Sequence, residues 1–309
     1  MMKLAVGEVI QGYRVTRFLG RGGFASTYLA EEEESGEKVA LKVGHPSGGG
    51  RQVTRLIEVT SRHTPEGISP DELPAEAVFF ENGGFRIDLF DDIEVAEMLR
   101  CEADLLAHCS SPNLVKLRNF FNSDDRSILA LEYVRGKTLR EKVRELEGIH
   151  LNWFLAVVRS LIRLQEDGEL EYHGDLKPEN IILKPSGKIV MIDPAMRGCD
   201  RGVITTTPHY NPLLLSTSKA DVTAIGIMIY EILTGTLPFD DVPWDHAGSN
   251  SGGETLRLSL SYFYSYCPPH MLNPKTPPEL ERIVYRCITV PGYGLLELKS
   301  DLEDFISKS

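Results

Sequence analysis

The stretch from Tyr172 to Asn180 constrains this chain more than any other, because it places an acid, a cation and an amide within six residues. These residues are Asp175, Lys177 and Asn180, and an apolar run follows at once. A second acid, Asp193, comes directly after the next apolar run. Two short buried strands that present polar groups at their ends commonly place charges beside a ligand. A few carboxylate and amide oxygens favour magnesium that arrives with a phosphorylated substrate.

The sequence His-Gly-Asp-Leu-Lys-Pro-Glu-Asn in this stretch resembles the catalytic loop of protein kinases, with Gly174 where an arginine is usual. By this resemblance Asp175 would accept the proton of the substrate hydroxyl or orient that hydroxyl, and Lys177 would neutralise the transferred phosphoryl group. Asn180 and Asp193 would hold Mg²⁺. A lysine two residues after the acid is the pattern associated with serine/threonine kinases rather than tyrosine kinases.

A glycine cluster near the start of the chain lies between two alternating segments that read as strands. It resembles the glycine-rich hairpin of protein kinases, whose backbone amides approach the phosphates of ATP because no Cβ stands in the way. Ala25 stands where the third glycine is usual, so a stiffer hairpin is expected. The hairpin residues that the resemblance assigns to ATP binding are Leu19, Gly20, Gly22, Gly23 and Thr27.

Lys42 lies in an apolar strand at 38–43 and resembles the kinase lysine that pairs with the α- and β-phosphates of ATP. Its carboxylate partner is expected on the next helix, predicted at 93–108, where several acids compete. Counting back from the Pro-Asn-Leu-Val-Lys-Leu segment at 112–117 selects Glu102. The simpler alternatives are a lysine that extends from a strand edge and an acid on the solvent side of an amphipathic helix.

A strand at 127–134 resembles the connection between the two lobes of a protein kinase. The resemblance places Leu131 at the gatekeeper position and turns the backbone of Glu132 and Val134 towards the adenine of ATP. The remaining positions that the resemblance assigns to nucleotide binding are Ala40 and Ile182.

The order of these segments predicts an α+β, bilobal fold like that of protein kinases. A small β-rich N-lobe is expected at 8–134 and a mainly helical C-lobe at 135–309. An insert at about 44–93 precedes the predicted regulatory helix, and within it 77–80 and 85–89 read as two strands joined across an Asn-Gly-Gly turn. A long insert with strands of its own is more often functional than slack, so we hypothesise that it binds a regulatory partner.

Several motifs depart from the kinase pattern. The sequence Asp-Pro-Ala that begins at Asp193 stands where Asp-Phe-Gly is usual, and its proline restricts the backbone. Gly174 removes the arginine that receives an activation-loop phosphate in related kinases, so control from elsewhere is expected. Thr207 is expected to bridge to Asp175 and Lys177. Asp221 is expected to brace the catalytic loop, and further helices are predicted at 138–146, 151–167, 254–267, 278–288 and 295–306.

Composition narrows the classes of partner. The 309 residues, 42% of them hydrophobic, suffice for two lobes with their own cores. A net charge of −12 argues against nucleic acid as the main partner and fits basic substrates. No apolar run approaches the ~18 residues of a membrane span. Five scattered cysteines without a C-x-x-C pair indicate reduced thiols and a cytoplasmic protein.

The sequence therefore favours a serine/threonine protein kinase that uses ATP and Mg²⁺, similar to the eukaryotic-like kinases of bacteria, with unidentified protein substrates. One alternative is a small-molecule phosphotransferase of the aminoglycoside or choline kinase type, because His-Gly-Asp and Ile-Asp-Pro are reminiscent of that branch. The other alternative is a pseudokinase or regulatory nucleotide-binding module, which the altered motifs and the insert suggest. Against it stand five residues that are all present: Lys42, Asp175, Lys177, Asn180 and Asp193.

Overall fold

A computed structural model of the chain describes most of its residues, and these form two compact units. Unit 1 contains the described residues up to 107 together with 116–133, and unit 2 contains 108–115 and the described residues from 134 onward. The chain thus passes from unit 1 to unit 2 next to the predicted lobe boundary. The described residues are 4–22, 24–45, 52–57, 86–90, 92–123, 126–145, 150–195, 207, 209–212, 215–238 and 266–308.

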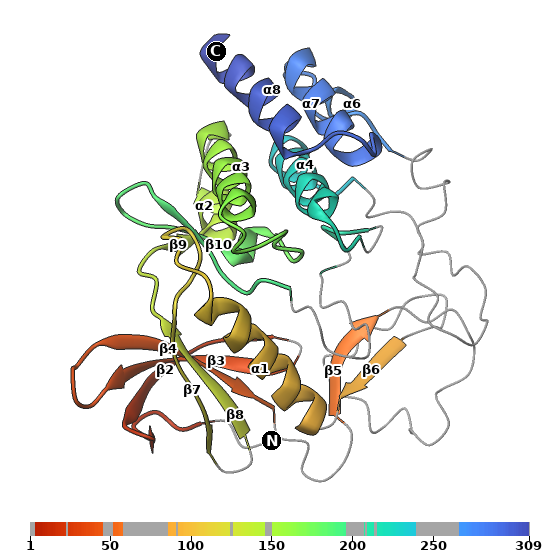
Figure 1. Ribbon diagram of the computed structural model, residues 1–309. Coiled ribbons are helices and arrows are strands. Elements are labelled where there is room, and N and C mark those ends of the chain that lie inside the picture. Colours follow the sequence, from red (N-terminus) through yellow and green to blue (C-terminus); the bar gives the residue numbers. More distant parts are fainter. Residues whose placement is uncertain are drawn as a thin grey trace. The chain divides into compact units, whose positions relative to one another are not determined.

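Unit 1 is built on a six-stranded antiparallel sheet with the strand order β1-β2-β3-β4-β8-β7 (Figure 1). The strand β2 begins with buried Tyr13, exposed Arg14 and buried Val15, which is the alternation of a sheet with one covered face. Val15, Ala30, Leu41 and Ile128 lie in its buried core. The bounds are β1 Val9–Ile10, β2 Tyr13–Arg21, β3 Ala25–Glu32, β4 Lys38–Gly44, β7 Leu117–Ser123 and β8 Arg126–Glu132.

The helix α1, Asp92–Ala107, packs against β8, β7 and β4 of the same unit. It buries an apolar stripe that includes Val95, Met98 and Leu99, as its helical spacing predicts. The approach is close, because a Cβ at Gly44 would lie 2.9 Å from Cγ1 of Val95. The predicted helix at 93–108 is therefore confirmed.

Two further strands of unit 1 lie within the predicted insert. The strand β5, Gln52–Ile57, pairs antiparallel with β6, Arg86–Phe90, as a two-stranded sheet. The strand predicted at 85–89 is therefore present, but the partner that the structure gives it is β5. The predicted partner at 77–80 lies outside the described residues. The local turn signal could not reveal a pairing between segments that are separated by a long connection.

Unit 2 is mainly helical. The central helix α4 packs against α7, and α3 packs against α8. Gly226 on α4 permits the close packing of α4 against α7, because a Cβ at Gly226 would lie 2.4 Å from Cβ of Cys287. The helices predicted at 138–146, 151–167, 278–288 and 295–306 are confirmed, and most of the helix predicted at 254–267 lies outside the described residues. Their bounds are α2 Leu139–Glu145, α3 Leu151–Glu166, α4 Ser218–Thr234, α6 Pro269–Leu272, α7 Pro278–Thr289 and α8 Leu295–Lys308.

A small antiparallel sheet in unit 2 carries the catalytic-loop motif. Its strands are β9 Lys137–Thr138, β10 Ile181–Leu183 and β11 Ile189–Met191, in the order β11-β10-β9. The 3-10 turn η2, Pro178–Asn180, leads directly into β10. The polar motif residues therefore lie at the ends of two short strands that are largely buried.

A polar cluster joins α4 to the end of α7. The ammonium group of Lys219 donates to the carbonyl oxygens of Cys287 at 2.8 Å, Tyr293 at 3.3 Å and Arg286 at 3.5 Å. Arg286 and the hydroxyl of Tyr293 both bind the carboxylate of Asp301, at 2.6 and 2.8 Å. These hydrogen bonds join α4, the end of α7 and α8 to one another.

No helix among the described residues has the length and apolar character needed to cross a membrane.

Candidate active site

Unit 1 contains the buried ion pair that the motif order predicts. Nζ of Lys42 on β4 lies 2.6 Å from Oε2 of Glu102 on α1, and the side chains are only 11% and 1% exposed. The same ammonium group lies 5.1 Å from the ring centroid of Phe24, which is a cation–π contact. A charge pair this well buried keeps the ammonium group of Lys42 in one place.

The glycine-rich hairpin joins β2 to β3 in unit 1. Gly20 pairs with Thr27 in the sheet, and the amide of Gly22 donates to the carbonyl of Ala25 at 2.7 Å. A Cβ at Gly20 would meet no atom within 4 Å, and the side chain of Leu19 is exposed. The hairpin therefore has room for another group to approach its backbone. Gly23 lies outside the described residues.

Two other predicted nucleotide-binding residues of unit 1 are neighbours across the strands β4 and β8. Ala40 pairs with Leu131, and Thr27 on β3 pairs with Lys42. The amide of Glu132 donates to the carbonyl of Lys116 at 2.8 Å. In unit 2, Val134 is buried and Ile182 is half-buried on β10. Their role in nucleotide binding stays a prediction.

Asp175 is the centre of the polar residues in unit 2. One oxygen of its carboxylate accepts the amide of Thr207 at 2.6 Å, and the other accepts Nζ of Lys177 at 2.9 Å. Lys177 also donates to the hydroxyl of Thr207 at 2.9 Å. The predicted bridge from Thr207 to both residues is confirmed. A buried acid, a cation and a threonine are thus joined in one hydrogen-bonded triangle.

The electrostatic setting of Asp175 makes it a stronger base than an ordinary aspartate. Burial raises the pKa of its carboxyl group, the ammonium of Lys177 opposes that rise, and the negative charge of Asp193 adds to it. Burial is the largest of these effects, because a carboxylate loses its hydration when it is covered by protein. The side chain is only 11% exposed. A carboxylate with a raised pKa takes up a proton more readily than an ordinary aspartate does.

Asn180 and Asp193 supply oxygens of the type that Mg²⁺ prefers. The amide nitrogen of Asn180 donates to the backbone oxygen of Asp175 at 2.9 Å and to its carboxylate at 3.2 Å. Because the amide nitrogen makes these bonds, the amide oxygen is the atom of Asn180 that could bind a cation. No three His, Cys, Asp or Glu side chains of the described residues gather as a metal cluster. The oxygens of Asn180 and Asp193 fit Mg²⁺ by their chemical type, and their role as its ligands stays a prediction.

Asp221 on α4 braces the loop that carries Asp175, as predicted. Its buried carboxylate accepts the backbone amides of His173 and Gly174 at 2.7 and 2.8 Å. The ring of His173 is hydrogen-bonded to the carbonyl of Ile192 at 3.0 Å. The backbone carbonyl of His173 accepts the amide of Ala195 at 2.7 Å. These bonds tie the catalytic loop to the segment that carries Asp193.

Gly174 and Asp193 both have left-handed backbone conformations, with φ of 81° and 59°. A Cβ at Gly174 would lie 2.8 Å from Cβ of Ala195, so glycine here and alanine there fit one another. The two departures from the kinase pattern are therefore a matched pair. Pro194 follows Asp193 directly, and the left-handed backbone at a non-glycine residue is a strained conformation that its surroundings must hold.

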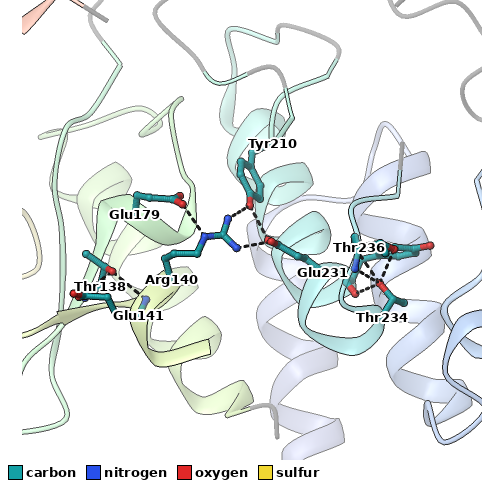
Figure 2. A network of polar contacts seen from close by, with 9 residues as sticks. Thr138, Arg140, Glu141, Glu179, Tyr210, Glu231, Thr234 and Thr236 are labelled. Atoms are coloured by element: carbon teal, nitrogen blue, oxygen red, sulfur yellow. Dashed lines mark hydrogen bonds and ion pairs between the residues drawn. The ribbon is translucent and has the colours of Figure 1, made fainter. Parts of the chain in front are cut away.

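Sequence reasoning did not single out Arg140, which lies between the catalytic loop and α4. Figure 2 shows its guanidinium group reaching Glu179, Glu231 and the hydroxyl of Tyr210. The hydroxyl of Tyr210 donates to the same Glu231 at 2.7 Å. No local pattern could have revealed this set, because its members come from distant parts of the chain.

Comparison with known proteins agrees with this geometry. Residues 89–289 match the family model of the protein kinase domain. Serine/threonine-protein kinase PrkC of Bacillus subtilis is 24% identical over an alignment that covers 97% of this chain and 41% of that protein. The probable serine/threonine-protein kinase PknB of Lactococcus lactis is 25% identical, with 92% of this chain and 40% of that protein covered. The chain thus spans about two fifths of the length of these relatives.

The fold is also that of solved kinase structures. A crystal structure of a variant PknI kinase domain from Mycobacterium tuberculosis superimposes with a TM-score of 0.61, at 18% identity, over 98% of this chain and 99% of the other. At this identity the likeness concerns the fold, an α+β protein kinase fold. The match to the family model covers well over half of the chain, which therefore belongs to the protein kinase family.

Proposed function

We propose that the chain is a serine/threonine protein kinase that transfers the γ-phosphoryl group of ATP to protein hydroxyl groups with the help of Mg²⁺. The observation that carries the proposal is the triangle of Asp175, Lys177 and Thr207. It places a buried carboxylate beside a cation and a threonine, which is what a hydroxyl acceptor and a charged phosphoryl group require. The names of the similar bacterial proteins support the same activity.

Each residue of unit 2 would have a separate task in the transfer. Asp175 would accept the proton of the substrate hydroxyl or orient that hydroxyl, and its raised pKa favours proton uptake. Lys177 would neutralise negative charge that spreads over the transferred group. Asn180 and Asp193 would hold Mg²⁺, which supplies positive charge beside the phosphate oxygens when it is bound.

The residues of unit 1 would bind ATP. Lys42 would pair with the α- and β-phosphates, and Glu102 would keep its ammonium group in place through the buried ion pair. The glycine hairpin would approach the phosphates with its backbone amides. The nucleotide would also contact residues on the strands and at the ends of the strands, namely Leu19, Thr27, Ala40, Leu131, Glu132, Val134 and Ile182.

The test is a transfer assay with purified protein, labelled ATP, Mg²⁺ and generic protein substrates. Wild-type protein is expected to label a substrate or itself, and Asp193→Ala is expected to abolish the label. Retained ATP binding without any transfer by wild type would contradict the proposal and favour a pseudokinase. Labelling of an aminoglycoside or choline but of no protein would favour a small-molecule phosphotransferase.

The predicted insert at about 44–93 is proposed to bind a regulatory partner. The support is its position directly before α1, the helix that carries Glu102. A partner that moved this helix would change the pairing of Glu102 with Lys42, and hence activity. Deleting residues 47–89 tests the proposal. Unchanged activity together with unchanged capture of binding proteins would contradict it.

A further inference from the structure

Arg140 on α2 contacts three side chains from three different segments of unit 2 (Figure 2). Its Nε donates to Oε1 of Glu179 at 2.7 Å, its Nη1 to Oε1 of Glu231, and its Nη2 to the hydroxyl of Tyr210. The hydroxyl of Tyr210 donates in turn to Oε2 of Glu231 at 2.7 Å. We call these four residues the Arg140 cluster.

Three of the four residues of the Arg140 cluster are largely shielded from water, which strengthens the hydrogen bonds between them, whereas the side chain of Glu179 is 47% exposed. The side chains of Arg140 and Glu231 are 21% and 16% exposed, and Tyr210 is buried. Burial lowers the pKa of Arg140, but its bonds to Glu231 and Glu179 outweigh that effect and raise it, so the guanidinium stays charged. Burial and the neighbouring Glu231 raise the pKa of Tyr210, so its hydroxyl keeps the proton that it donates.

Tyr210, one member of the Arg140 cluster, is connected to Thr207 by a backbone hydrogen bond. The amides of Tyr210 and Asn211 both donate to the carbonyl oxygen of Thr207 at 3.0 Å, which closes a tight turn. The amide and the hydroxyl of Thr207 bind Asp175 and Lys177. Backbone hydrogen bonds thus connect Tyr210, whose side chain belongs to the Arg140 cluster, to Thr207.

Glu179, another member of the Arg140 cluster, belongs to the catalytic loop. Glu179 lies in the turn η2, between Lys177 and Asn180 in the sequence. One planar guanidinium group thus bonds to both of the segments that meet at Asp175. A planar donor whose three nitrogens each bond to a different residue fixes its partners in angle as well as in distance.

We propose that Arg140 is a positioning residue, which holds the turn η2 and the turn 207–211 in register so that Lys177 and Thr207 both stay on Asp175. The kinetic part of this inference rests on the proposed kinase function. The structural part does not, because it concerns the hydrogen bonds of the turn 207–211. A network of packed side chains that two loops share is a physical route for such an effect.

The first measurement is amide hydrogen exchange, read residue by residue by NMR in the full chain. In Arg140→Met, the amides of Thr207 and Asn211 are expected to exchange at least about tenfold faster, since their bonds would open more often. Amides in the middle of α4 are expected to keep their rates. Arg159→Met is the matched control, because Arg159 forms a surface ion pair with Glu303. It should leave both groups of amides unchanged.

The second measurement is steady-state kinetics on a protein substrate. Arg140→Met is expected to lower kcat by about 10- to 100-fold and to leave KM for ATP within about threefold, because misplacing the acceptor side costs rate rather than nucleotide binding. Arg140→Lys keeps the charge without the planar fork, so its kcat should fall between wild type and Arg140→Met. Tyr210→Phe removes one hydroxyl only and provides a milder variant if Arg140→Met folds poorly.

The outcomes separate the two proposals. Faster exchange at Thr207 and Asn211 with a lowered kcat supports the role of Arg140. Unchanged exchange at both amides in Arg140→Met and Tyr210→Phe overturns it, whether or not the wild-type protein transfers phosphate. An unchanged kcat in variants of an active protein also overturns it. A wild-type protein without any transfer contradicts the kinase function alone, and the exchange rates then decide the role of Arg140.

Discussion

At the scale of single residues, the ion pair of Lys42 and Glu102 offers a test of how charge is held in unit 1. Lys42→Met would leave the carboxylate of Glu102 buried without its cation. We expect it to lower the free energy of unfolding by about 3 kcal/mol. The double variant Lys42→Met/Glu102→Met should cost about 1 kcal/mol or less, because no buried charge remains. Urea denaturation of the full chain measures both.

The control for this pair is Arg14→Met, because the ion pair of Arg14 with Glu33 is exposed, at 51% and 42% of the two side chains. Its loss should cost less than about 1 kcal/mol. A single Lys42→Met variant that is as stable as the double variant would show that the buried charge of Glu102 is not held by Lys42.

A second residue, His45 at the end of β4, predicts a pH dependence of stability. Its side chain is buried and its Nε2 lies 2.9 Å from the hydroxyl of Ser26. Burial, and to a smaller extent the positive charge of Arg21, lowers its pKa from 6.5 to about 4. Between these values the unfolded chain binds a proton that the folded chain does not. Stability is therefore fully present above the unfolded pKa and is lost as the pH falls towards 4.

The loss of stability at pH 5 relative to pH 7.5 should be about 1 to 2 kcal/mol, after allowance for screening by solvent. Denaturation curves at several pH values measure it. The variant His45→Gln should lose this part of the pH dependence, and the exposed His150→Gln should retain it. Identical pH profiles for wild type and His45→Gln would contradict the account.

At the scale of elements, Lys219 is predicted to hold the end of α7 to α4. Its ammonium group donates to three backbone carbonyls near the last turn of α7, with the shortest bond at 2.8 Å. A cation at a helix C-terminus satisfies carbonyls that have no partner within the helix. Lys219→Met should lower the free energy of unfolding by about 2 kcal/mol, since buried acceptors lose a charged donor.

Thermal and urea unfolding check this prediction, and Lys275→Met provides the control because Lys275 is exposed. The control should change stability by less than about 0.5 kcal/mol. Equal stability of the two variants would mean that the carbonyls at the end of α7 are satisfied without Lys219.

The elements also show what their sequences could and could not predict. The helices α1, α3, α7 and α8 end within two residues of their predicted limits, because each has a wide apolar stripe at helical spacing. The pairing of β5 with β6 could not be predicted from the sequence, because a long segment separates the two strands and neither strand carries a signal that identifies its partner. Local patterns thus predict elements well and long-range pairings poorly.

At the scale of the whole molecule, one part of the candidate site could be predicted from the sequence and another part could not. The pairing of Lys42 with Glu102 could be predicted because the order of known motifs selects one acid among several on the helix. The Arg140 cluster could not, because its bonds join residues 39, 70 and 91 positions apart. Arg140 is one of two arginines in the short helix α2, and no sequence pattern identifies its distant partners.

The matched change at Gly174 and Ala195 also appears only in three dimensions. The sequence shows two separate departures from the kinase pattern, and the structure shows that one occupies the space that the other leaves. The loop that carries Asp175 is thereby held through backbone bonds to Asp221 and without an arginine side chain. Control of activity from elsewhere in the molecule stays a prediction.

The central claim is that Asp175 acts on a protein hydroxyl during phosphoryl transfer from ATP. Single-turnover transfer of labelled phosphate to protein serine or threonine, compared between wild type and Asp175→Asn, tests it most directly. The account predicts a rate at least about 100-fold lower in the variant with ATP affinity changed by less than about threefold. Equal rates in the two proteins, or no phosphoserine or phosphothreonine formed by wild type on any protein, would contradict it.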